Sequence, residues 1–584
     1  MTLCPLLLVL CAALTNAVHL CPLLGPSWPA PTRLPDDPTV QSALQNITTT
    51  IQDAIKAGNF SGNSLSLQIF DTSSSYSLLT LSHTAEAINT TIGVSEVDEN
   101  TVFRIGSASK IFTMLLLLIE DGFNILQDPV AKYIPEIQAA VVDLRRNSTK
   151  RRDGINFTKW NEVTVGELAS YLAGIARDYG ILDLTEQAPL LESLGFPALP
   201  PAQIPPCGVP NPCSRKQFFN GLTRAHPIVP TSSTPIYSNA GFQILGYVLE
   251  AVAGKDFEKV LKKDLIKPLN LTHTFYNTPS TSLGVIPISQ GEYWWNFNIG
   301  EEAPAGGIYS SAKDMSIFGR AILNSTLLPR SITRRWMKPH THTSSLGFAV
   351  GAPWEILSFG DERPIDLYTK SGDIGTYSSA LALDIDHGAG FVILGAGSNT
   401  HVSIALASDL VSASLLPALE QAAKNQAYER FAGRYALSTG NSSITITTDD
   451  GPALVVTSWF NNGTDMFPGY MALNGISDPS QLSIRLYPTG LESPGQISFR
   501  AVIPLALPAG IGPFTSSCIT WVTVDSQRYG NVGIDEFVFN LDENGNAISV
   551  SPRVLRTVLP ITSSSDTMMW GRWQENLRAG SMKR

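Results

Sequence analysis

A serine and a lysine three residues apart, Ser107 and Lys110, stand at the start of a long apolar run in this sequence. On a helix, residues at this spacing lie on the same face, so the serine hydroxyl and the lysine ammonium would be neighbours. The run from 111 to 119 is apolar nearly all round, which predicts a helix buried in a core. Burial lowers the pKa of a lysine, and such a lysine can accept the proton of an adjacent serine. The pair is therefore a candidate nucleophile with its base.

The Ser-x-x-Lys spacing alone is a weak signal, because it fixes only two residues and recurs at Ser310-Ser-Ala-Lys313. A helix cap followed by a solvated lysine has the same spacing. Two further short motifs follow the first copy, namely Tyr237-Ser-Asn239 and Lys370-Ser371-Gly372. The Ser310 copy finds its Tyr-x-Asn only at Tyr529-Gly-Asn531, downstream of Lys-Ser-Gly, so it is predicted to be a helix start. The order of the three motifs, rather than any one of them, indicates a site.

The three motifs in this order resemble those of the serine β-lactamase and penicillin-binding-protein-like superfamily, in its class C β-lactamase and esterase branch. The neighbouring stretches Phe103-x-Ile-Gly-Ser107, Leu126-x-Asp-Pro-Val130 and Ala305-Gly-Gly-Ile-Tyr-Ser-Ser-Ala-Lys-Asp-Met315 are similar as well. The resemblance covers roughly residues 43–423. It implies an α/β (α+β) fold, in which an antiparallel sheet is flanked by helices and joined to an all-α cluster. The C-terminal part resembles the β domain of secreted fungal β-lactamase-like proteins.

The resemblance implies a covalent mechanism in which each motif residue has a role. Ser107 would be the acylated nucleophile, and Lys110 would help to deprotonate it. Tyr237 would shuttle protons between the serine and the leaving group, while Asn239 would orient Lys110 and the substrate. Lys370 would hold Tyr237 and the incoming group electrostatically. The resemblance implies no metal and no cofactor.

The substrate-binding residues implied by the resemblance are Ser371, Gly372 and Asp373, with the backbone N–H groups of Ser107 and Asp373 as the oxyanion hole. A glycine at 372 suits this because the substrate must lie against bare backbone. Asp373 departs from the usual small or hydroxyl residue, so its carboxylate either disfavours an anionic substrate or points to solvent. Residues 168–174, predicted to be a structural helix, replace the usual His-Thr-Ser-Gly. No residue resembles a dedicated deacylating glutamate, so water activation would fall to Tyr237 and its neighbours.

The elements that must position these motifs follow from hydrophobic periodicity. Helices are expected near 39–57, from 107 onward, and over 164–176, 236–252, 312–323 and 402–423, and strands at 65–69, 76–81, 367–372, 378–384 and 391–394. Residues 184–235 form a Pro-rich insertion of the kind that serves as a lid or binding loop. Beyond about 428 short strands alternate with turns, without a convincing helix. The predicted organisation is a signal peptide at 1–17, a β-lactamase-like domain at 18–427 and a β domain at 428–584.

Length and composition limit the function. The chain has 584 residues, of which 43% are hydrophobic and 15% charged, which is typical of a well-buried globular protein with more than one domain. A net charge of −10, with no long basic block, argues against a nucleic-acid partner. The expected partner is a small-molecule or short peptide substrate, and the sequence does not fix the oligomeric state.

The N-terminus predicts secretion. Residues 1–17 have an apolar core and small or polar residues before Ala17, as a signal peptide does, although a basic n-region is missing. The apolar run is too short to span a bilayer comfortably, so no membrane partner is expected. The predicted location is extracellular. Asn-x-Ser/Thr sequons, which predict N-linked glycans, occur at Asn46, Asn59, Asn89, Asn147, Asn156, Asn270, Asn324, Asn441 and Asn462.

The cysteines agree with a secreted protein. Without the signal peptide four remain, Cys21, Cys207, Cys213 and Cys518, and none has the Cys-x-x-Cys spacing of a metal site. Cys207 and Cys213 bracket a Gly-Val-Pro-Asn-Pro turn, which favours a local disulfide between them. Cys21 would then pair with Cys518 by elimination only.

Other chemistries fit the sequence less well. A zinc site would need more ligands than His340-Thr-His342, the only close histidine pair, and a Ser-His-Asp hydrolase would need a Gly-x-Ser-x-Gly elbow. A catalytically silent binding protein of the same fold would be favoured by loss of Ser107, Lys110 or Tyr237, and all three are present. The sequence therefore predicts a secreted serine hydrolase that acts through a Ser107 acyl-enzyme on an ester, amide or lactone. An acyltransferase, or a hydrolase that tailors a secondary metabolite, is the alternative within enzymes.

Overall fold

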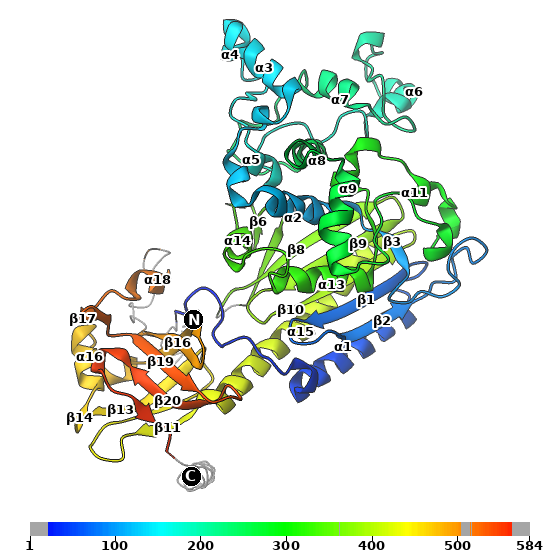
Figure 1. Cartoon of the computed structure of the whole chain (residues 1–584). Helices are drawn as coiled ribbons and strands as arrows, with labels where there is room; N and C mark the ends of the chain where they lie inside the picture. Colours follow the sequence, from blue (N-terminus) through cyan, green and yellow to red (C-terminus); the bar gives the residue numbers. More distant parts are fainter. Residues whose placement is uncertain (1–20, 361–362, 504–513, 515–516, 563–584) are drawn as a thin grey trace, which may run out of the picture. The chain divides into compact units, whose positions relative to one another are not determined.

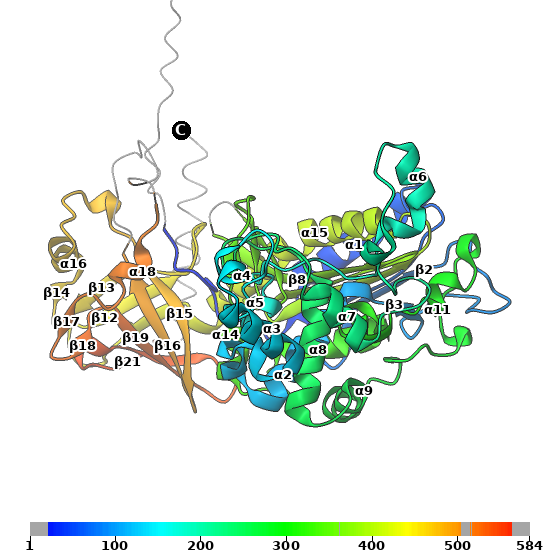
Figure 2. The ribbon, with the colours of Figure 1, turned by 90° about the horizontal axis from the view of Figure 1, so that it is seen from above.

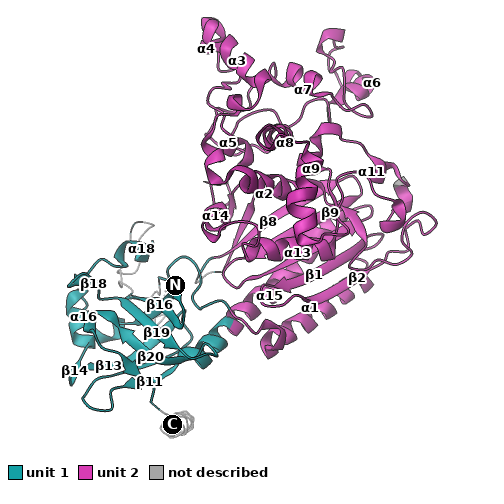
Figure 3. Ribbon diagram, viewed as in Figure 1, with its two compact units in different colours: residues 1–30, 360–364, 423–584 teal, residues 31–359, 365–422 magenta. Residues whose placement is uncertain are grey.

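The structure of this chain is a computed structural model, which describes residues 21–360, 363–503, 514 and 517–562. The predicted signal peptide, residues 1–17, lies outside the described residues. The chain divides into two compact units (Figure 3): unit 1 comprises residues 1–30, 360–364 and 423–584, and unit 2 comprises residues 31–359 and 365–422. All three motifs of the predicted site fall in unit 2.

Unit 2 is built on an eight-stranded antiparallel sheet (Figure 1). In spatial order the strands are β2 (Ser77–His83), β1 (Ser64–Asp71), β10 (Ala389–Ala396), β9 (Tyr377–Asp384), β8 (Ile365–Ile374), β7 (Glu355–Phe359), β6 (Phe348–Val350) and β5 (Thr341–His342). Central strands β1 and β10 are buried along their whole length, because helices cover both faces of the sheet there. The sheet order brings β8, which carries the Lys-Ser-Gly motif, next to β9.

Two helices cover one face of the sheet, α1 (Pro38–Lys56) and the part of α15 (Thr400–Phe431) that belongs to unit 2. Figure 2 shows α1 and α15 on one side of the sheet and α2 and α8 on the other. The side chain of Asp37 caps α1 by accepting hydrogen bonds from the N–H groups of Thr39 and Val40. Within the described residues α15 alone is long and apolar enough to cross a membrane, and half of that apolar stretch is buried.

The other face of the sheet carries the helices that hold the site. These are α2 (Ser109–Asp121), α8 (Asn239–Ala253) and α13 (Ala312–Leu323), whose apolar side chains form one large core with the sheet. Around them lie α3 (Pro135–Arg146), α5 (Val165–Ala169), α7 (Arg215–Leu222) and α9 (Phe257–Leu261). The predicted fold class, an antiparallel sheet flanked by helices with an all-α cluster and a C-terminal β region, is confirmed.

Two of the expected helices differ from the structure. The helix expected over 164–176 ends at Ala169, because Tyr171 and Gly174 have left-handed backbone conformations with φ of 63° and 67°. Within the segment 168–174 only Leu168 and Ala169 are helical, at the end of α5, and the rest is a turn rather than a structural helix. The helix expected from 107 begins as a 3₁₀ turn, η2 (Gly106–Ala108), before α2. The Ser310 copy of Ser-x-x-Lys is a helix start as predicted, since Ser311 caps α13.

The insertion at 184–235 contains two short helices, α6 (Ala188–Ser193) and α7, within irregular chain. Its end is anchored by backbone hydrogen bonds to the turn at 171–174, for example from the N–H of Ile228 to the carbonyl of Gly174. The predicted disulfide between Cys207 and Cys213 is present in it. The insertion is thus tied to the segment that leads into the site.

Unit 1 contains a second antiparallel sheet whose two ends meet. The strands are β11 (Gly433–Ala436), β12 (Ser443–Thr447), β13 (Leu454–Asn461), β15 (Ile484–Ser493), β16 (Gln496–Val502), β19 (Glu536–Leu541), β20 (Ala547–Pro552) and β21 (Leu559–Pro560), with β14 (Thr464–Asp465) paired to β13. A bridge between Tyr435 and Ile561 joins the ends of the sheet, which leaves fewer open edges. The expectation of no helix here is wrong in detail, because α16 (Phe467–Leu473) packs on the core through Tyr470. The Cys21–Cys518 disulfide lies in this unit.

Candidate active site

Ser107 lies in the η2 turn, where the end of strand β8 comes very close. A Cβ atom at Gly372 would stand 2.1 Å from the carbonyl oxygen of Ile105, and one at Gly106 would stand 2.6 Å from the backbone nitrogen of Asp373. Gly106 also has φ of 48°, which a glycine adopts without strain. Only glycines fit at both positions. The turn and the strand therefore approach each other through bare backbone, with the N–H of Asp373 beside the serine turn.

Lys110, the second residue of α2, is fully buried, and its side chain contacts Ser107. Its Nζ atom lies 2.9 Å from the Ser107 Oγ and 2.7 Å from both the Asn239 Oδ1 and the carbonyl oxygen of Ala305. All three neighbours are uncharged acceptors. Burial lowers the pKa of Lys110, and the nearby Lys370 lowers it further, while Tyr237 and Glu302 oppose the shift.

Tyr237 lies two residues before the start of α8, and its hydroxyl points at the same serine. The Tyr237 hydroxyl donates to the Ser107 Oγ at 2.7 Å. Burial alone would raise the pKa of this phenol, but the ammonium groups of Lys110 and Lys370 outweigh burial and lower it. The Lys110 and Lys370 Nζ atoms lie 4.9 and 5.3 Å from the centre of the Tyr237 ring. A phenol held in this way can pass a proton to and from the serine.

Two residues that the sequence did not single out support the Tyr237 ring. Tyr171 stacks on it with ring centres 4.9 Å apart and planes inclined by 19°. Tyr171 has a left-handed backbone conformation, with φ of 63°. Arg177, whose side chain is 61% exposed, lies with its guanidinium 5.0 Å from the centre of the same ring. Through Tyr171, the segment that replaces the usual motif therefore contacts the site.

Asn239 is the first residue of α8 and has both ends of its amide engaged. Its Oδ1 accepts from the Lys110 Nζ at 2.7 Å, and its Nδ2 donates to the Asp178 Oδ1 at 2.9 Å. The N-cap Ser238 fixes the start of the helix, because its Oγ accepts from the N–H of Gly241 at 2.9 Å. The helix start thus places the asparagine between a lysine and a carboxyl group.

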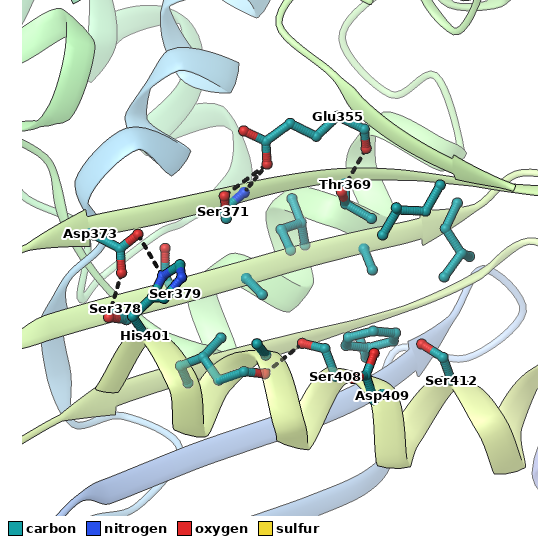
Figure 4. Close-up of a pocket in the computed structure, with 18 of the residues that line it drawn as sticks. Glu355, Thr369, Ser371, Asp373, Ser378, Ser379, His401, Ser408, Asp409 and Ser412 are labelled. Carbon is teal, nitrogen blue, oxygen red and sulfur yellow. Dashed lines mark hydrogen bonds and ion pairs between the residues drawn. The ribbon is translucent and has the colours of Figure 1, made fainter. Parts of the chain in front are cut away.

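Lys370 is also buried, but unlike Lys110 it has a carboxylate partner, Glu355 on β7. The Lys370 Nζ lies 2.5 Å from the Glu355 Oε1, and burial alone would lower the pKa of Lys370, but the Glu355 charge raises it. The other carboxylate oxygen accepts from the N–H and the hydroxyl of Ser371 at 2.9 and 2.8 Å (Figure 4). Sequence reasoning missed Glu355, although a lone glutamate in the apolar stretch from Trp354 to Leu357 was an available signal.

The side chain of Asp373 lies on the other face of β8 from Lys370, because side chains alternate along a strand. It accepts from the Ser378 Oγ at 2.6 Å and lies 3.1 Å from the His401 Nδ1 (Figure 4). There it lines a largely apolar pocket of about 370 Å³ between the strands and α15. Of the two readings of Asp373, the structure supports the one in which only its backbone N–H faces the serine turn.

The structure thus brings Ser107, Lys110, Tyr237, Asn239 and Lys370 into one cluster, as predicted from the sequence. Among the described residues no group of three or more histidine, cysteine, aspartate and glutamate side chains could hold a metal ion. The cluster offers a hydroxyl that two basic groups contact, which is an arrangement for activating a serine.

Comparison with known proteins agrees with this geometry. Residues 79–449 match the family described as "Beta-lactamase". The chain belongs to the beta-lactamase family. Residues 423–562 match a second family, described as "Beta-lactamase-like-like, C-terminal domain". The family match spans all three motifs of the site, from the serine turn to strand β8.

Relatives within the beta-lactamase family extend over nearly the whole chain. A "Beta-lactamase-like protein" of Arthroderma benhamiae is 30% identical over 593 residues, covering 93% of this chain and 96% of the relative. A "Probable hydrolase M10" of a Phoma species is 25% identical, covering 92% of this chain and 90% of the relative. A solved β-lactamase/D-alanine carboxypeptidase of Yersinia pestis, complexed with citrate, is 19% identical with a TM-score of 0.47 and covers 65% of this chain and 99% of that chain.

Proposed function

We propose that this member of the beta-lactamase family is a serine hydrolase that forms an acyl-enzyme on Ser107 from an ester, amide or lactone. The observation that carries the proposal is that two basic groups reach one hydroxyl. The Tyr237 hydroxyl and the Lys110 Nζ lie 2.7 and 2.9 Å from the Ser107 Oγ. Both groups have pKa values lowered from their ordinary ranges, so a larger fraction of each is deprotonated at neutral pH and available to accept a proton.

The proposed acylation is a transfer of the substrate acyl group to the serine. The Ser107 Oγ forms a bond to the substrate carbonyl carbon, while its proton passes to Lys110 directly or through Tyr237. The negative charge on the carbonyl oxygen faces the backbone N–H groups of Ser107 and Asp373, and one such donor is typically worth about 3 to 4 kcal/mol. The bond to the leaving group then breaks, and Tyr237 returns the proton to that group.

Deacylation repeats these steps with water as the nucleophile. Tyr237, between the two lysines, is the group placed to take a proton from water and return it to the Ser107 Oγ. One relative is named "Probable hydrolase M10", which supports water rather than another acceptor. The substrate would be a small molecule or a short peptide.

We also propose that the protein is secreted and carries N-linked glycans. The two disulfides support an oxidising compartment. None of the nine sequon asparagines is buried, so each is accessible to the glycosylation machinery. Treatment of the protein secreted from a eukaryotic host with an endoglycosidase should lower its mass, and an unchanged mass would contradict the glycans.

The test of the catalytic proposal is intact-mass spectrometry of the deglycosylated protein after exposure to a fluorophosphonate probe. We expect one adduct on Ser107, together with turnover of a short-chain p-nitrophenyl ester. The Ser107→Ala variant should show neither, because without the hydroxyl no covalent intermediate forms. Peptide mapping of the labelled protein identifies the modified residue.

Three results would contradict the proposal. Labelling that persists in Ser107→Ala would place the nucleophile at another residue, and a correctly folded wild-type protein with neither adduct nor turnover would favour the silent binding protein. Ester consumption that yields a transferred product when an alcohol or amine is added, at the expense of the free acid, would favour the acyltransferase.

A further inference from the structure

Two carboxyl groups to which the proposed mechanism assigns no role, Asp178 and Glu302, lie directly behind Asn239. The Asp178 side chain is 7% exposed and Glu302 is 8% exposed. Asp178 belongs to the loop that follows Gly174, and Glu302 ends the turn η10 (Gly300–Glu302). The two buried carboxyl groups are close enough to share a side-chain hydrogen bond, and such a bond requires one of them to carry a proton.

The pair is linked to the serine through an unbroken line of contacts. The Asp178 Oδ1 accepts from the Asn239 Nδ2 at 2.9 Å, and the Asn239 Oδ1 accepts from the Lys110 Nζ at 2.7 Å. An ionised carboxylate can only accept hydrogen bonds, so it selects the nitrogen end of the asparagine amide. The oxygen end then necessarily faces Lys110. The charge on Asp178 therefore decides the orientation of a group that holds the lysine.

The charges around the pair put the proton on Glu302. Burial raises the pKa of Asp178, but the hydrogen bond from Asn239 and the positive charges of Arg177 and Lys110 oppose that rise, and the Arg177 Nε lies 3.4 Å from the Asp178 Oδ2. Burial and the neighbouring Asp178 carboxylate raise the pKa of Glu302 to about 8, against the opposing effects of Lys110 on α2 and Arg177 in the loop. At neutral pH the pair thus carries one negative charge, on Asp178.

We propose that Asp178 and Glu302 form a positioning pair that shares one proton, fixes the Asn239 amide toward Lys110 and limits activity at alkaline pH. The inference rests on the proposed acyl-enzyme at Ser107. When Glu302 loses its proton, the two carboxylates repel each other and a second negative charge acts on Lys110. That charge favours the ammonium form, and an ammonium cannot take the proton of the serine.

The test is the pH dependence of fluorophosphonate labelling and of kcat/KM for a p-nitrophenyl ester, corrected for spontaneous hydrolysis, between pH 5 and 10. The wild-type protein should lose activity on an alkaline limb near pH 8. Glu302→Gln keeps a donor for Asp178 but does not titrate, so its alkaline limb should move up by about one pH unit or more, or vanish. Its activity at pH 7 should fall by no more than about tenfold.

A second pair of variants separates positioning from folding. Asp178→Leu leaves the Asn239 Nδ2 without its acceptor, so kcat should fall by about tenfold or more while KM changes by less than about threefold. Asp178→Asn restores an oxygen acceptor and should recover part of the lost kcat. Thermal unfolding of each variant checks that it is folded.

The possible outcomes are distinct. An alkaline limb that is identical in wild type and Glu302→Gln, or a wild-type profile without such a limb up to pH 10, would overturn the inference. Equal kcat for folded Asp178→Leu and Asp178→Asn would overturn it too, whether or not Glu302→Gln folds. Failure of the wild-type protein to label at Ser107 would instead refute the proposed function on which the inference rests.

Discussion

Two clusters of buried charge in unit 2 differ in how their charges are balanced. The Ser107 cluster holds Lys110, whose three contacts are uncharged, so burial lowers its pKa. A second cluster, the His387 cluster, consists of His387, Asp384 and Glu420, between the β9–β10 turn and α15. The His387 Nδ1 lies 2.6 Å from the Asp384 Oδ2, and its Nε2 lies 3.0 Å from the Glu420 Oε2. Burial alone would lower the pKa of His387, but the two carboxylates raise it to about 10.

The difference shows that burial by itself does not make a site. A buried cation in direct contact with carboxylates keeps its proton and acts as a structural tie, as His387 does. A buried lysine among neutral acceptors gives up its proton more readily, so its neutral amine is available to accept a proton, as in Lys110. Lys370 belongs with His387 in this respect, because Glu355 balances it. The Ser107 cluster therefore contains one lysine without a carboxylate partner, Lys110, and one with such a partner, Lys370, and Tyr237 lies between them.

The largest expected effect on activity comes from replacing Lys110, the buried lysine without a carboxylate partner. Lys110→Met should lower kcat/KM for ester hydrolysis by roughly a thousandfold, because Ser107 loses its base. The fold should persist, since an apolar side chain suits a fully buried position. Lys110→Arg is the matched control: it keeps the positive charge but cannot give up its proton, so it should be as inactive as Lys110→Met. An active Lys110→Arg would show that charge, not basicity, is what the position supplies.

The next largest effect is a loss of stability, expected when Lys370 loses the opposite charge of Glu355. Glu355→Gln leaves Lys370 buried without its opposite charge, which should lower the free energy of unfolding by about 3 to 5 kcal/mol. Urea unfolding followed by circular dichroism measures this loss. Adding Lys370→Met to Glu355→Gln should restore part of it, because no buried charge then remains unpaired. A double variant that is less stable than Glu355→Gln would contradict the account.

A smaller effect is expected from pH acting on the His387 cluster. The pKa of His387 is raised from 6.5 to about 10, so its contribution to stability is complete below pH 6.5 and lost as pH rises through 10. The lost stability should be on the order of 2 to 4 kcal/mol, allowing for the partial exposure of Glu420. The urea midpoints of wild type and His387→Gln, compared at pH 6 and pH 10.5, measure it. The wild type should lose its advantage over the variant between these pH values, and an unchanged difference would show that His387 is not charged.

The sequence predicted the parts of the fold whose signal is local. Periodicity predicted helices at 39–57 and 312–323, close to the limits of α1 and α13, whereas the antiparallel sheet was implied by the resemblance to the β-lactamase-like superfamily. The helix expected at 164–176 was wrong because its apolar residues continue through Tyr171 and Gly174, where the backbone turns left-handed. Nothing in an apolar pattern records such a turn.

The site residues likewise fall into those that the sequence could predict and those that it could not. Ser107, Lys110, Tyr237, Asn239 and Lys370 could be found because they occur in short motifs with a fixed order. Glu355, Asp178 and Glu302 stand alone in the sequence, and their importance arises only where β7, a loop and η10 meet the motifs in space. A carboxylate that balances or fails to balance a lysine is a property of the folded chain, so spacing along the sequence cannot predict it.

The most direct test of the central claim is the acid side of the pH profile of Ser107 labelling by a fluorophosphonate. The account predicts that the rate rises to a plateau through a group with a pKa below that of an ordinary lysine, and that this rise disappears in Lys110→Arg. A rate that increases with pH in proportion to hydroxide without reaching a plateau, or one that Lys110→Arg leaves unchanged, would contradict the claim that Lys110 is the base of an activated serine.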